Sequence, residues 1–531
     1  PRCALGPCRG GVMKPVRLLA IDVGTQSARA IVFDAEGHLV AKAQTIFDPT
    51  YTSPQPGWAE QDPEIYWRGV VDSCQRLWQE GAIKPQDITG IALTTQRATM
   101  ICVDAAGKVL RPATVWLDQR LCTAPPALGL LWDTLFKLAG ASDLIHHMQA
   151  QAEANWFAQH QPEMWKETKK FLFLSGWLTQ RLVGEYVDSV GCQVGYLPFD
   201  YKHLSWAKPG DFKWKALAVT PDQLPRIMPP GSRLGDLSAR TAAALGLPAG
   251  IPVIAAAADK ACEVLGCGVL EPDIAQLSFG TTATINTTQS KYIEVQRLLP
   301  PYPAAVPGAF NTEIQIYRGF WMVSWFKREF AHREQALAQE RGVAVESLFD
   351  DLIKSVPPGS MGLTLQPYWT PGVRDPGPEA KGAIIGFGDV HTRAHLYRAL
   401  IEGLVYGLRA GSEQIEKRLG KPLRLLRVAG GGSQSDCAMQ ITADVFGLPA
   451  ERPEIYETSA LGAAMNAAVG LGIHLDYVSA ARAMCRIGSR FEPQEPAHKT
   501  YEALYREVYQ PLYPRLKPLY EKIRAITGYP P

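Results

Sequence analysis

The chain has almost no net charge and no long apolar run. Its 531 residues carry 54 lysines and arginines against 52 aspartates and glutamates, a formal charge of +2, so no large field of one sign would attract nucleic acid or an anionic membrane. The most apolar segment, residues 251–258, is followed by Asp259 and Lys260 and is too short to span a bilayer. We therefore expect a cytoplasmic protein that binds small molecules, not nucleic acid or membrane.

Several sequence motifs are also missing. The ten cysteines form no Cys-x-x-Cys pair and have no histidine at zinc-finger spacing, which excludes a zinc module and fits a reducing compartment. No segment reads Gly-x-x-x-x-Gly-Lys-Ser/Thr, so a Walker loop is excluded. Gly386-Phe-Gly388 begins like a dinucleotide fingerprint, but His391 stands where the third glycine is needed. This argues against a dehydrogenase.

Length and composition indicate a globular protein of about two or three domains, since 46% of the residues are hydrophobic and 20% are charged. Residues 1–12 are basic and Gly-rich and lack the apolar core of a signal peptide. We expect Met13 to be the natural start and leave residues 1–12 out of the fold prediction.

Two parts of the chain share a pattern of strand, small polar turn and strand. In the first, Asp22-Val-Gly-Thr-Gln-Ser27 precedes a predicted strand at 28–33 and another at 39–43. In the second, Ser278-Phe-Gly-Thr-Thr282 lies between predicted strands at 274–277 and 283–287. Because the second turn repeats the spacing of the first, we expect a duplicated α/β fold.

Other elements follow from capping residues and periodicity. Asp62-Pro63-Glu64 predicts the start of a helix, and Thr392 and Gly420 predict the two ends of a long one. Residues 199–230 lack periodicity and are expected to form a surface insertion or lid. The remaining predictions are strands at 88–95, 252–258 and 423–429, the last followed by a tight turn at 430–433 and a helix at 436–446.

The two turns have the composition of phosphate sites. The first combines a carboxylate, a glycine and two hydroxyls, which suits a phosphate chain and its Mg2+, although a plain β-turn would look the same. A second such turn, Gly280-Thr-Thr282, favours the functional interpretation, because a triphosphate held between two domains needs a loop from each. The strand, glycine turn and helix around Gly430 are typical of a nucleotide site.

Asp259 and Asp22 are the candidate acids. Phosphoryl transfer to an alcohol needs a carboxylate that accepts the hydroxyl proton and a metal that neutralises the phosphates, and Asp259 and Asp22 could divide these roles. The alternative is that Asp259 only pairs with Lys260. Gln96, Arg97, Trp116 and Asp118 are typical of a sugar site, with planar polar groups for hydroxyls and an aromatic face for the carbon skeleton. Equally, Arg97 could pair with Asp118 and Trp116 could belong to the core.

Together these segments resemble the FGGY carbohydrate kinases, the family of glycerol kinase, xylulokinase and ribulokinase. The likeness runs from about residue 16 to about residue 472. It rests on Asp22-Val-Gly-Thr-Gln-Ser-Ala-Arg29 and Ser278-Phe-Gly-Thr-Thr282 as phosphate motifs, Val428-Ala-Gly-Gly-Gly-Ser-Gln-Ser435 as the adenosine motif, Gly382-Ala-Ile-Ile-Gly386 with Ala399-Leu-Ile-Glu402 as the C-terminal signature, and Glu451-Arg-Pro-Glu454 with Ser459-Ala-Leu-Gly-Ala-Ala464 after it.

The resemblance implies an α/β fold of two ribonuclease-H-like, actin-like domains that close on a cleft, at residues 14–265 and 266–531, with ATP held mainly by the second. It implies ATP and Mg2+ as cofactors, a homodimer, and Asp259 as the catalytic base. The implied metal ligands are Asp22 and Asp259. The implied nucleotide contacts are Gly24, Thr25, Gln26, Ser27, Arg29, Gly280, Thr281, Thr282, Gly430, Gly431 and Ser435, and the substrate contacts are Gln96, Arg97, Trp116, Asp118, Asp259 and Lys260.

The substrate stays open because the chain departs from each branch of the family. Glycerol kinases read Arg-Glu-Thr where this chain has Arg97-Ala98-Thr99, and they have Gln where Lys260 follows the base. Xylulokinases carry Gln-Met-His near Gln96, and Glu153 stands where the family signature has Lys. We favour a pentulose such as xylulose or ribulose, with glycerol or another polyol as the alternative. A non-catalytic sugar sensor and a sugar-independent actin-like ATPase are the rivals from other classes.

Overall fold

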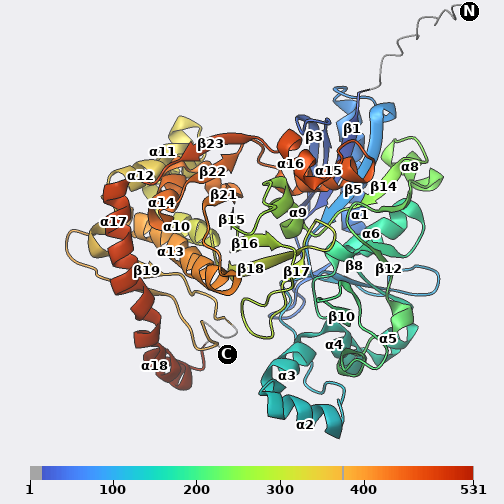
Figure 1. The fold of residues 1–531 in the computed structure, drawn as a ribbon, viewed down its shortest axis with the longest axis horizontal. Coiled ribbons are helices and arrows are strands. Elements are labelled where there is room, and N and C mark those ends of the chain that lie inside the picture. The colour runs from blue at the N-terminus through green and yellow to red at the C-terminus, as the bar shows by residue number, and fades with distance from the viewer. Residues whose placement is uncertain (1–14, 373–375, 530–531) are drawn as a thin grey trace, which may run out of the picture. The chain divides into compact units, whose positions relative to one another are not determined.

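The computed structural model describes residues 15–372 and 376–529, so the excluded residues 1–12 lie outside it. Two compact units make up the chain (Figure 1). The first runs to Leu197 and adds Pro209–Asp259 and Ala463–Met484, whereas the second comprises Pro198–Lys208, Lys260–Gly462 and the residues from Cys485 onward. Among the described residues, no helix is long and apolar enough to cross a membrane.

A six-stranded sheet forms the centre of the first unit, in the order β13-β14-β5-β1-β2-β3. Strands β1, β2 and β3 form an antiparallel meander, and β5 runs parallel to both β1 and β14. Nearly every residue of β1 and β2 is buried, which explains their continuous apolar sequence. The strand bounds are β1 Arg17–Val23, β2 Ser27–Phe33, β3 Leu39–Ile46, β5 Ile88–Thr95, β13 Arg233–Asp236 and β14 Pro252–Ala255.

Helix α1, Pro63–Gln79, begins as the sequence predicts. The Asp62 side chain accepts a hydrogen bond from the Glu64 N–H, and Pro63 occupies the first helical turn. Tyr66, Val70, Cys74 and Leu77 recur at helical spacing and are buried against β2 and β3.

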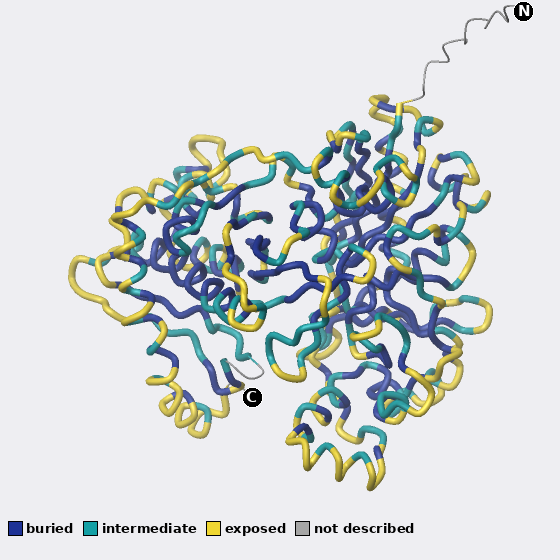
Figure 2. Tube along the Cα trace, in the orientation of Figure 1, coloured by how far each residue is buried: buried dark blue, intermediate teal, exposed yellow. Residues whose placement is uncertain are grey.

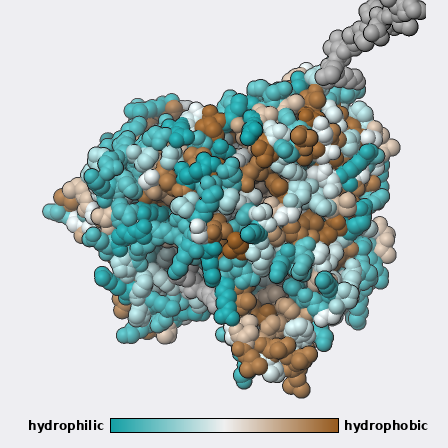
Figure 3. Space-filling model, viewed as in Figure 1, coloured by the Kyte–Doolittle hydropathy of each residue, from teal (hydrophilic) through white to brown (hydrophobic). Residues whose placement is uncertain are grey.

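Smaller elements complete the first unit. A second sheet has the order β4-β7-β6-β8, from Glu60–Gln61, Ala113–Thr114, Met100–Val103 and Lys170–Phe173. The helices are α2 Leu130–Ala139, α3 Ser142–Gln151, α4 Glu153–His160, α5 Pro162–Glu167, α6 Leu174–Val183, α7 Lys213–Ala216, α8 Ala239–Leu245 and α16 Tyr477–Met484. Helix α2 presents Leu130, Leu131 and Leu138 to solvent. Figure 3 shows an apolar patch at the lower edge of the view, where Figure 1 labels α2.

The prediction that residues 199–230 form a surface insertion is correct only in part, because most of the segment is exposed or half-buried but some of it packs into the unit. Leu217, Val219 and Leu224 are buried, and β12, Arg226–Met228, pairs in parallel with β9, Val187–Ser189. The elements of this segment are two to four residues long, which is too short to show periodicity in the sequence. The hairpin of β10 and β11, Phe199–Asp200 and Ser205–Trp206, lies in the stretch that belongs to the second unit.

The second unit contains a seven-stranded sheet in the order β17-β18-β16-β15-β21-β22-β23. Its β15, β16 and β18 are successively antiparallel, and β21 runs parallel to both β15 and β22. This is the order and direction of the first sheet, so the expected duplication is present. The bounds are β15 Ile274–Phe279, β16 Ala283–Gln289, β17 Tyr302–Pro303, β18 Phe310–Ile316, β21 Leu425–Ala429, β22 Ala450–Pro453 and β23 Ile487–Phe491.

The long helix α13, Arg393–Leu419, is central to the core of this unit. It begins after Thr392 and ends at Gly420, whose φ of 66° is left-handed. Its buried positions reach beyond one face, and Figure 2 shows it as dark blue. The other helices and strands are α9 Asp259–Gly266, α10 Trp321–Phe330, α11 His332–Arg341, α12 Phe349–Lys354, α14 Asp436–Phe446, α17 Glu495–Leu504, α18 Gln510–Thr527, β19 Thr364–Gln366 and β20 Ala383–Ile385. Helix α15, Thr458–Gly470, is divided between the units, because Gly462 ends the second unit's segment and Ala463 begins one of the first.

One expectation about the candidate base needs correction. The sequence predicts a strand through residue 258 that ends at Asp259, but β14 ends at Ala255 and Asp259 is the first residue of α9. The run of alanines at 256–258 reads as a buried strand because these residues are buried, although their backbone has left the sheet.

Candidate active site

The first phosphate turn follows β1 and is closed by a hydrogen bond from the Gly24 N–H to the Ser27 carbonyl, 3.0 Å. Asp22 and Arg29 are cross-strand partners in β1 and β2, and Arg29 Nη1 lies 3.0 Å from Asp22 Oδ2. The Asp22 side chain is 8% exposed, so a paired cation offsets part of the cost of burying it. The structure thus brings together two residues that the sequence predicts for phosphate and metal.

A chain of hydrogen bonds joins this turn to predicted sugar residues. Trp116 Nε1 donates to Thr25 Oγ1 at 2.9 Å, and the Thr25 hydroxyl donates to Gln96 Oε1. Gln96 Nε2 then donates to the Tyr66 hydroxyl at 3.1 Å. Trp116 is 43% exposed, so it is not part of the core. One hydroxyl, that of Thr25, therefore orients both Gln96 and Trp116.

Two residues that the sequence prediction missed complete this network. The Tyr66 hydroxyl donates to Gln61 Oε1, and Gln61 Nε2 donates to the Thr25 carbonyl at 3.0 Å, so the chain of bonds returns to the turn. Burial raises the pKa of Tyr66, and its phenol stays a neutral donor. On the apolar face of α1 this tyrosine looks like an ordinary core residue, and only its buried partners reveal the role.

Asp118 is fully engaged inside the first unit. Its carboxylate accepts bonds from the Ala59 N–H at 2.7 Å, from the Arg120 N–H at 3.0 Å and from the Arg120 guanidinium at 2.7 and 2.6 Å. The alternative partner named from the sequence was Arg97, and the structure pairs Asp118 with Arg120. Arg120 also binds Glu60 and stacks 4.1 Å from the centroid of the Trp58 ring. This favours a supporting role for Asp118 and leaves its contact with substrate a prediction.

Arg97 is followed by an unusual backbone conformation. Ala98, which stands where glycerol kinases carry a carboxylate, has a φ of 49°, a left-handed value that costs an alanine on the order of 1 kcal/mol or more. The preceding β5 ends at Thr95, and the Gln96 N–H donates to the Val23 carbonyl at 2.9 Å. The strained residue therefore directly follows two predicted substrate residues, where it determines the direction in which the chain leaves the sheet.

The second phosphate turn, between β15 and β16, is held by the segment before α10. Phe320 N–H donates to the Gly280 carbonyl at 3.0 Å, Trp321 N–H to the Thr281 carbonyl at 3.4 Å, and the Thr282 hydroxyl to the Tyr317 carbonyl at 3.2 Å. The carbonyls of the turn are thus bound by the protein itself. Backbone N–H groups are the part of such a turn that suits phosphate.

The glycine turn after β21 lies against the second phosphate turn. Gly430 has a φ of 87°, and a Cβ at this position would lie 2.9 Å from the Phe279 carbonyl carbon. No other residue fits this close approach. Gly431 is exposed, and a Cβ there would lie 3.6 Å from the Tyr456 hydroxyl. Ser435 is the N-cap of α14 and bonds Asp350, so its predicted adenosine contact shares a side chain that already has partners.

Lys260 points toward the second phosphate turn. Its Nζ lies 2.9 Å from Glu263 Oε2 and 2.6 Å from Ser278 Oγ. Lys260 thus pairs with Glu263, and the pairing of Lys260 with Asp259 considered from the sequence stays a prediction. Asp259 itself is partly exposed at the start of α9, and its role as base stays a prediction.

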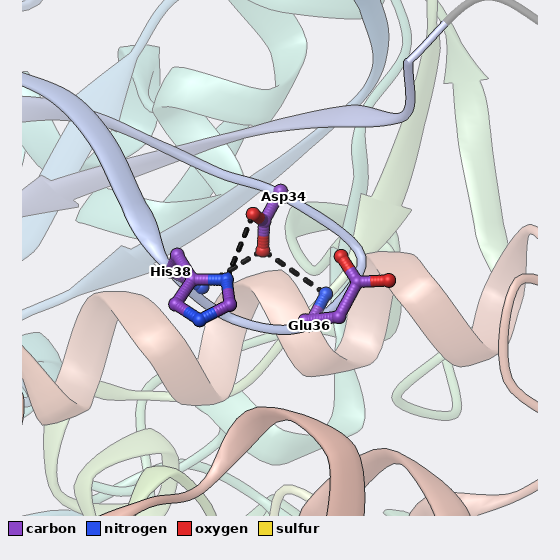
Figure 4. Close-up of side chains that lie close together, drawn as sticks. All are labelled: Asp34, Glu36 and His38. Atoms are coloured by element: carbon purple, nitrogen blue, oxygen red, sulfur yellow. Dashed lines mark hydrogen bonds and ion pairs between the residues drawn. The ribbon is translucent and has the colours of Figure 1, made fainter.

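A further group of polar side chains lies away from these turns, in the hairpin between β2 and β3. The potential ligand atoms of Asp34, Glu36 and His38 lie within 4.8 Å of one another (Figure 4). Asp34 Oδ1 accepts the N–H groups of Glu36 and His38, at 3.0 and 2.8 Å, and Oδ2 lies 2.9 Å from His38 Nδ1. These bonds are those of a polar hairpin turn, and they account for the grouping without a metal.

Comparison with known families identifies the architecture. Residues 17–266 match the N-terminal domain of the FGGY family of carbohydrate kinases, and residues 275–471 match its C-terminal domain. The chain belongs to this family. The two-domain α/β fold and the carbohydrate kinase activity expected from the resemblance are thereby confirmed. Kinases of this family use ATP, so this kinase acts on a sugar-type substrate and ATP.

Relatives with different names match almost the whole chain. An Escherichia coli (strain K12) protein named uncharacterized sugar kinase YgcE is 28% identical over 521 residues, which cover 96% of this chain and 97% of that protein. A glycerol kinase of Methylibium petroleiphilum is 30% identical and covers 92% and 97%. The crystal structure of a xylulose kinase from Rhodospirillum rubrum has a TM-score of 0.77 at 26% identity, with 95% and 100% covered.

Proposed function

We propose that this kinase transfers the γ-phosphoryl group of ATP to a hydroxyl of a small sugar, most favourably a pentulose such as xylulose or ribulose. Asp259 accepts the hydroxyl proton as the substrate oxygen attacks the γ-phosphorus. The new P–O bond forms as the bond to the β-phosphate oxygen breaks, and ADP leaves. The alternative substrate is glycerol or another polyol, and relatives with both kinds of name match the chain at similar identity.

The observation that carries this proposal is the shared hydroxyl of Thr25. Because it binds both Gln96 and Trp116, a turn suited to phosphate is coupled directly to an amide and an indole suited to a sugar. A sugar-independent ATPase has no use for this coupling. Positioning of this kind supplies much of the rate enhancement in phosphoryl transfer.

The carboxylates fit the Mg2+ that such chemistry uses. Asp22 and Asp259 would hold the ion, since carboxylate oxygens are the hard ligands that Mg2+ prefers. The pairing of Asp22 with Arg29 fixes the direction of this carboxylate. When bound, the metal neutralises phosphate charge. Arg29, Gly24, Gln26 and Ser27 would line the phosphates on the same turn.

Ala98 affects which substrate the site can bind. At position 98 a glycerol kinase has a carboxylate that binds a substrate hydroxyl. This chain has an alanine there, in a left-handed conformation, which cannot make that hydrogen bond. This weakens the case for glycerol and favours a longer substrate that reaches Gln96 and Trp116.

We also propose, as expected from the sequence, that the enzyme is a cytoplasmic homodimer, which fractionation and light scattering would test.

A coupled assay of ADP release tests the proposal. Mg-ATP would be supplied with pentuloses, pentitols, tetritols, glycerol and hexoses in turn, beside a control without sugar. We expect one pentulose to stimulate ADP release strongly. Equal ADP release without sugar, or none with any member of the panel, would overturn the proposal, whereas stimulation by glycerol alone would replace the pentulose with the polyol alternative.

A further inference from the structure

A small ionic cluster lies at the entrance to the second phosphate turn. Lys260 Nζ is 2.9 Å from Glu263 Oε2 and 2.6 Å from Ser278 Oγ, and Ser278 Oγ is 2.9 Å from Glu263 Oε1. Glu263 is 6% exposed and Ser278 is 1% exposed. All three residues belong to the second unit, with two on α9 and one on β15.

The three contacts fix the Ser278 hydroxyl completely. Since an ammonium group can only donate, Ser278 Oγ accepts from Lys260 and gives its own proton to Glu263. A hydroxyl with both a donor and an acceptor assigned cannot rotate without breaking a charge-assisted bond. The same oxygen lies 3.7 Å from the point where Gly280 would carry a Cβ. The cluster thus packs directly beneath the glycine of the phosphate turn.

Stability alone does not explain an ion pair at this place. The Glu263 side chain is 7% exposed and that of Lys260 is 23% exposed. Burying the carboxylate costs desolvation energy that its attraction to the partly buried ammonium only roughly repays, and apolar residues of similar volume often do as well. Lys260 also follows Asp259, so it belongs to the first turn of the helix that begins with the proposed base. The Lys260 side chain therefore connects the start of α9 to Ser278, the first residue of the second phosphate turn.

We propose that Lys260 is a positioning residue for phosphoryl transfer, which with Glu263 orients Ser278 and thereby holds the second phosphate turn in register with α9. The inference rests on the proposed function for its catalytic consequence, but its effect on nucleotide binding can be measured without any sugar. This role is additional to the sugar contact expected from the sequence, and it rests on the contact of the ammonium group with Ser278.

Three variants separate positioning from simple charge balance. Lys260→Met leaves Glu263 buried without its cation, so we expect a lower Tm together with weaker binding of Mg-ATP. Glu263→Gln removes the carboxylate, and the double variant removes both charges, so the penalty of an unpaired charge disappears. We expect the double variant to recover the wild-type Tm but not the affinity for Mg-ATP.

For Lys260→Met and for the double variant, we expect Mg-ATP affinity and kcat/KM for ATP to fall by about 10- to 100-fold. This factor corresponds to the free energy of one charge-assisted hydrogen bond. Lys260→Arg should recover part of this loss. Lys327→Met is the matched control, because Lys327 also pairs with a glutamate, Glu346, at 2.8 Å but on the surface of the same unit, and it should leave ATP binding unchanged.

Titration calorimetry with Mg-ATP alone and the ADP-release assay give the two readouts. A double variant that recovers both Tm and ATP affinity would show that the pair is structural and would overturn the proposal, as would Lys260→Met with wild-type ATP binding. If no sugar stimulates the wild-type enzyme, the proposed function fails, but the calorimetric comparison of the variants still decides the role of Lys260.

Discussion

The two units have the same central sheet but treat the turn after its first strand differently. In the first unit, Asp22 precedes the turn and pairs with Arg29 on the neighbouring strand. In the second, Ser278 takes the equivalent place. The carboxylate and the cation beside it are Glu263 and Lys260, which both lie on helix α9. Each turn therefore has one carboxylate and one cation beside it, supplied by different elements.

The surroundings of the turns differ more than the turns do. The first turn is joined through Thr25 to Gln96 and Trp116, side chains that suit a sugar. The second turn is approached by Gly430, where even a methyl group does not fit. Two copies of the same sheet can thus bind different ligands. Polar side chains surround the turn of the first copy, and the backbone of a glycine turn lies against the turn of the second. We infer that the first unit recognises the sugar and the second the nucleotide.

The largest expected effect comes from Asp259, the proposed proton acceptor. Asp259→Asn removes the proton acceptor and keeps the shape of the side chain, so kcat should fall by about 100- to 10,000-fold. Calorimetric affinity for Mg-ATP should stay within a few-fold of wild type. Asp72→Asn, at an exposed position on α1, is the control and should keep full activity. Substantial turnover by Asp259→Asn would rule out this assignment of the base.

A pair of glycine variants compares the backbone around the two turns. A Cβ at Gly430 would meet the Phe279 backbone at 2.9 Å, and the φ of 87° adds strain, whereas a Cβ at Gly24 would have its nearest contact 3.9 Å away. Gly430→Ala should lower the free energy of unfolding by about 2 to 4 kcal/mol, and Gly24→Ala by less than about 1 kcal/mol. Denaturant unfolding measures both, and equal losses would contradict the comparison.

The polar network is tested with two buried tyrosines. Tyr66→Phe removes the partner of Gln61 Oε1 and of Gln96 Nε2, which should cost about 1 to 3 kcal/mol of stability and raise KM for the sugar several-fold more than KM for ATP. Among the described residues, the Tyr406 hydroxyl of the second unit is buried with no hydrogen-bond partner. Tyr406→Phe should therefore be neutral. A Tyr66→Phe enzyme with unchanged sugar KM would remove the network from the substrate site.

The smallest expected effect concerns pH. Burial raises the pKa of Glu153 to about 7, above the ordinary value for a glutamate, so the folded protein holds a proton that the unfolded chain has lost. The stability contributed by this group is therefore full below about pH 4.5 and falls as pH rises toward 7. Glu153→Gln should raise Tm at pH 8 and leave it nearly unchanged at pH 4.5, which scanning calorimetry would detect.

A buried glutamate in the second unit gives the contrast. Burial also raises the pKa of Glu402, but Arg398 lies 2.7 Å away and opposes the shift. Glu402→Gln would leave Arg398 buried without its counter-charge, so the Tm should fall at both pH values. If Glu153→Gln also lowers Tm at both, Glu153 is paired in the way that Glu402 is.

The sequence predicts local features far better than long-range ones. The helix at 436–446 has the predicted bounds, and Thr392 and Gly420 flank α13 as their capping preferences suggest. The contacts that define the site are different, because they join distant segments. Thr25 and Gln96 are 71 positions apart, and no periodicity or cap encodes such a bond.

The one error about the candidate base and the two unforeseen partners of Lys260 have the same origin. The alanines before Asp259 are buried like a strand although the chain has left the sheet, and burial alone does not distinguish the two. The expected contact of Lys260 with the sugar stays a prediction, and the structure adds two partners that the sequence did not indicate, Glu263 one helical turn away and Ser278 of β15. Charged neighbours in three dimensions decide the direction of a lysine, and they are not read from its position in the chain.

The most direct test of the inference that the first unit binds the sugar and the second binds the nucleotide is to measure the affinity of one variant in each unit for both ligands. Gly431→Val would place a side chain on the exposed glycine turn of the second unit, and Trp116→Leu would remove the exposed indole of the first. Calorimetric titration of each variant with ADP and, separately, with the sugar identified by the ADP-release assay gives four affinities. We predict that Gly431→Val weakens only ADP binding and Trp116→Leu only sugar binding. Loss of both ligands in either variant, or the reverse assignment, would contradict the account.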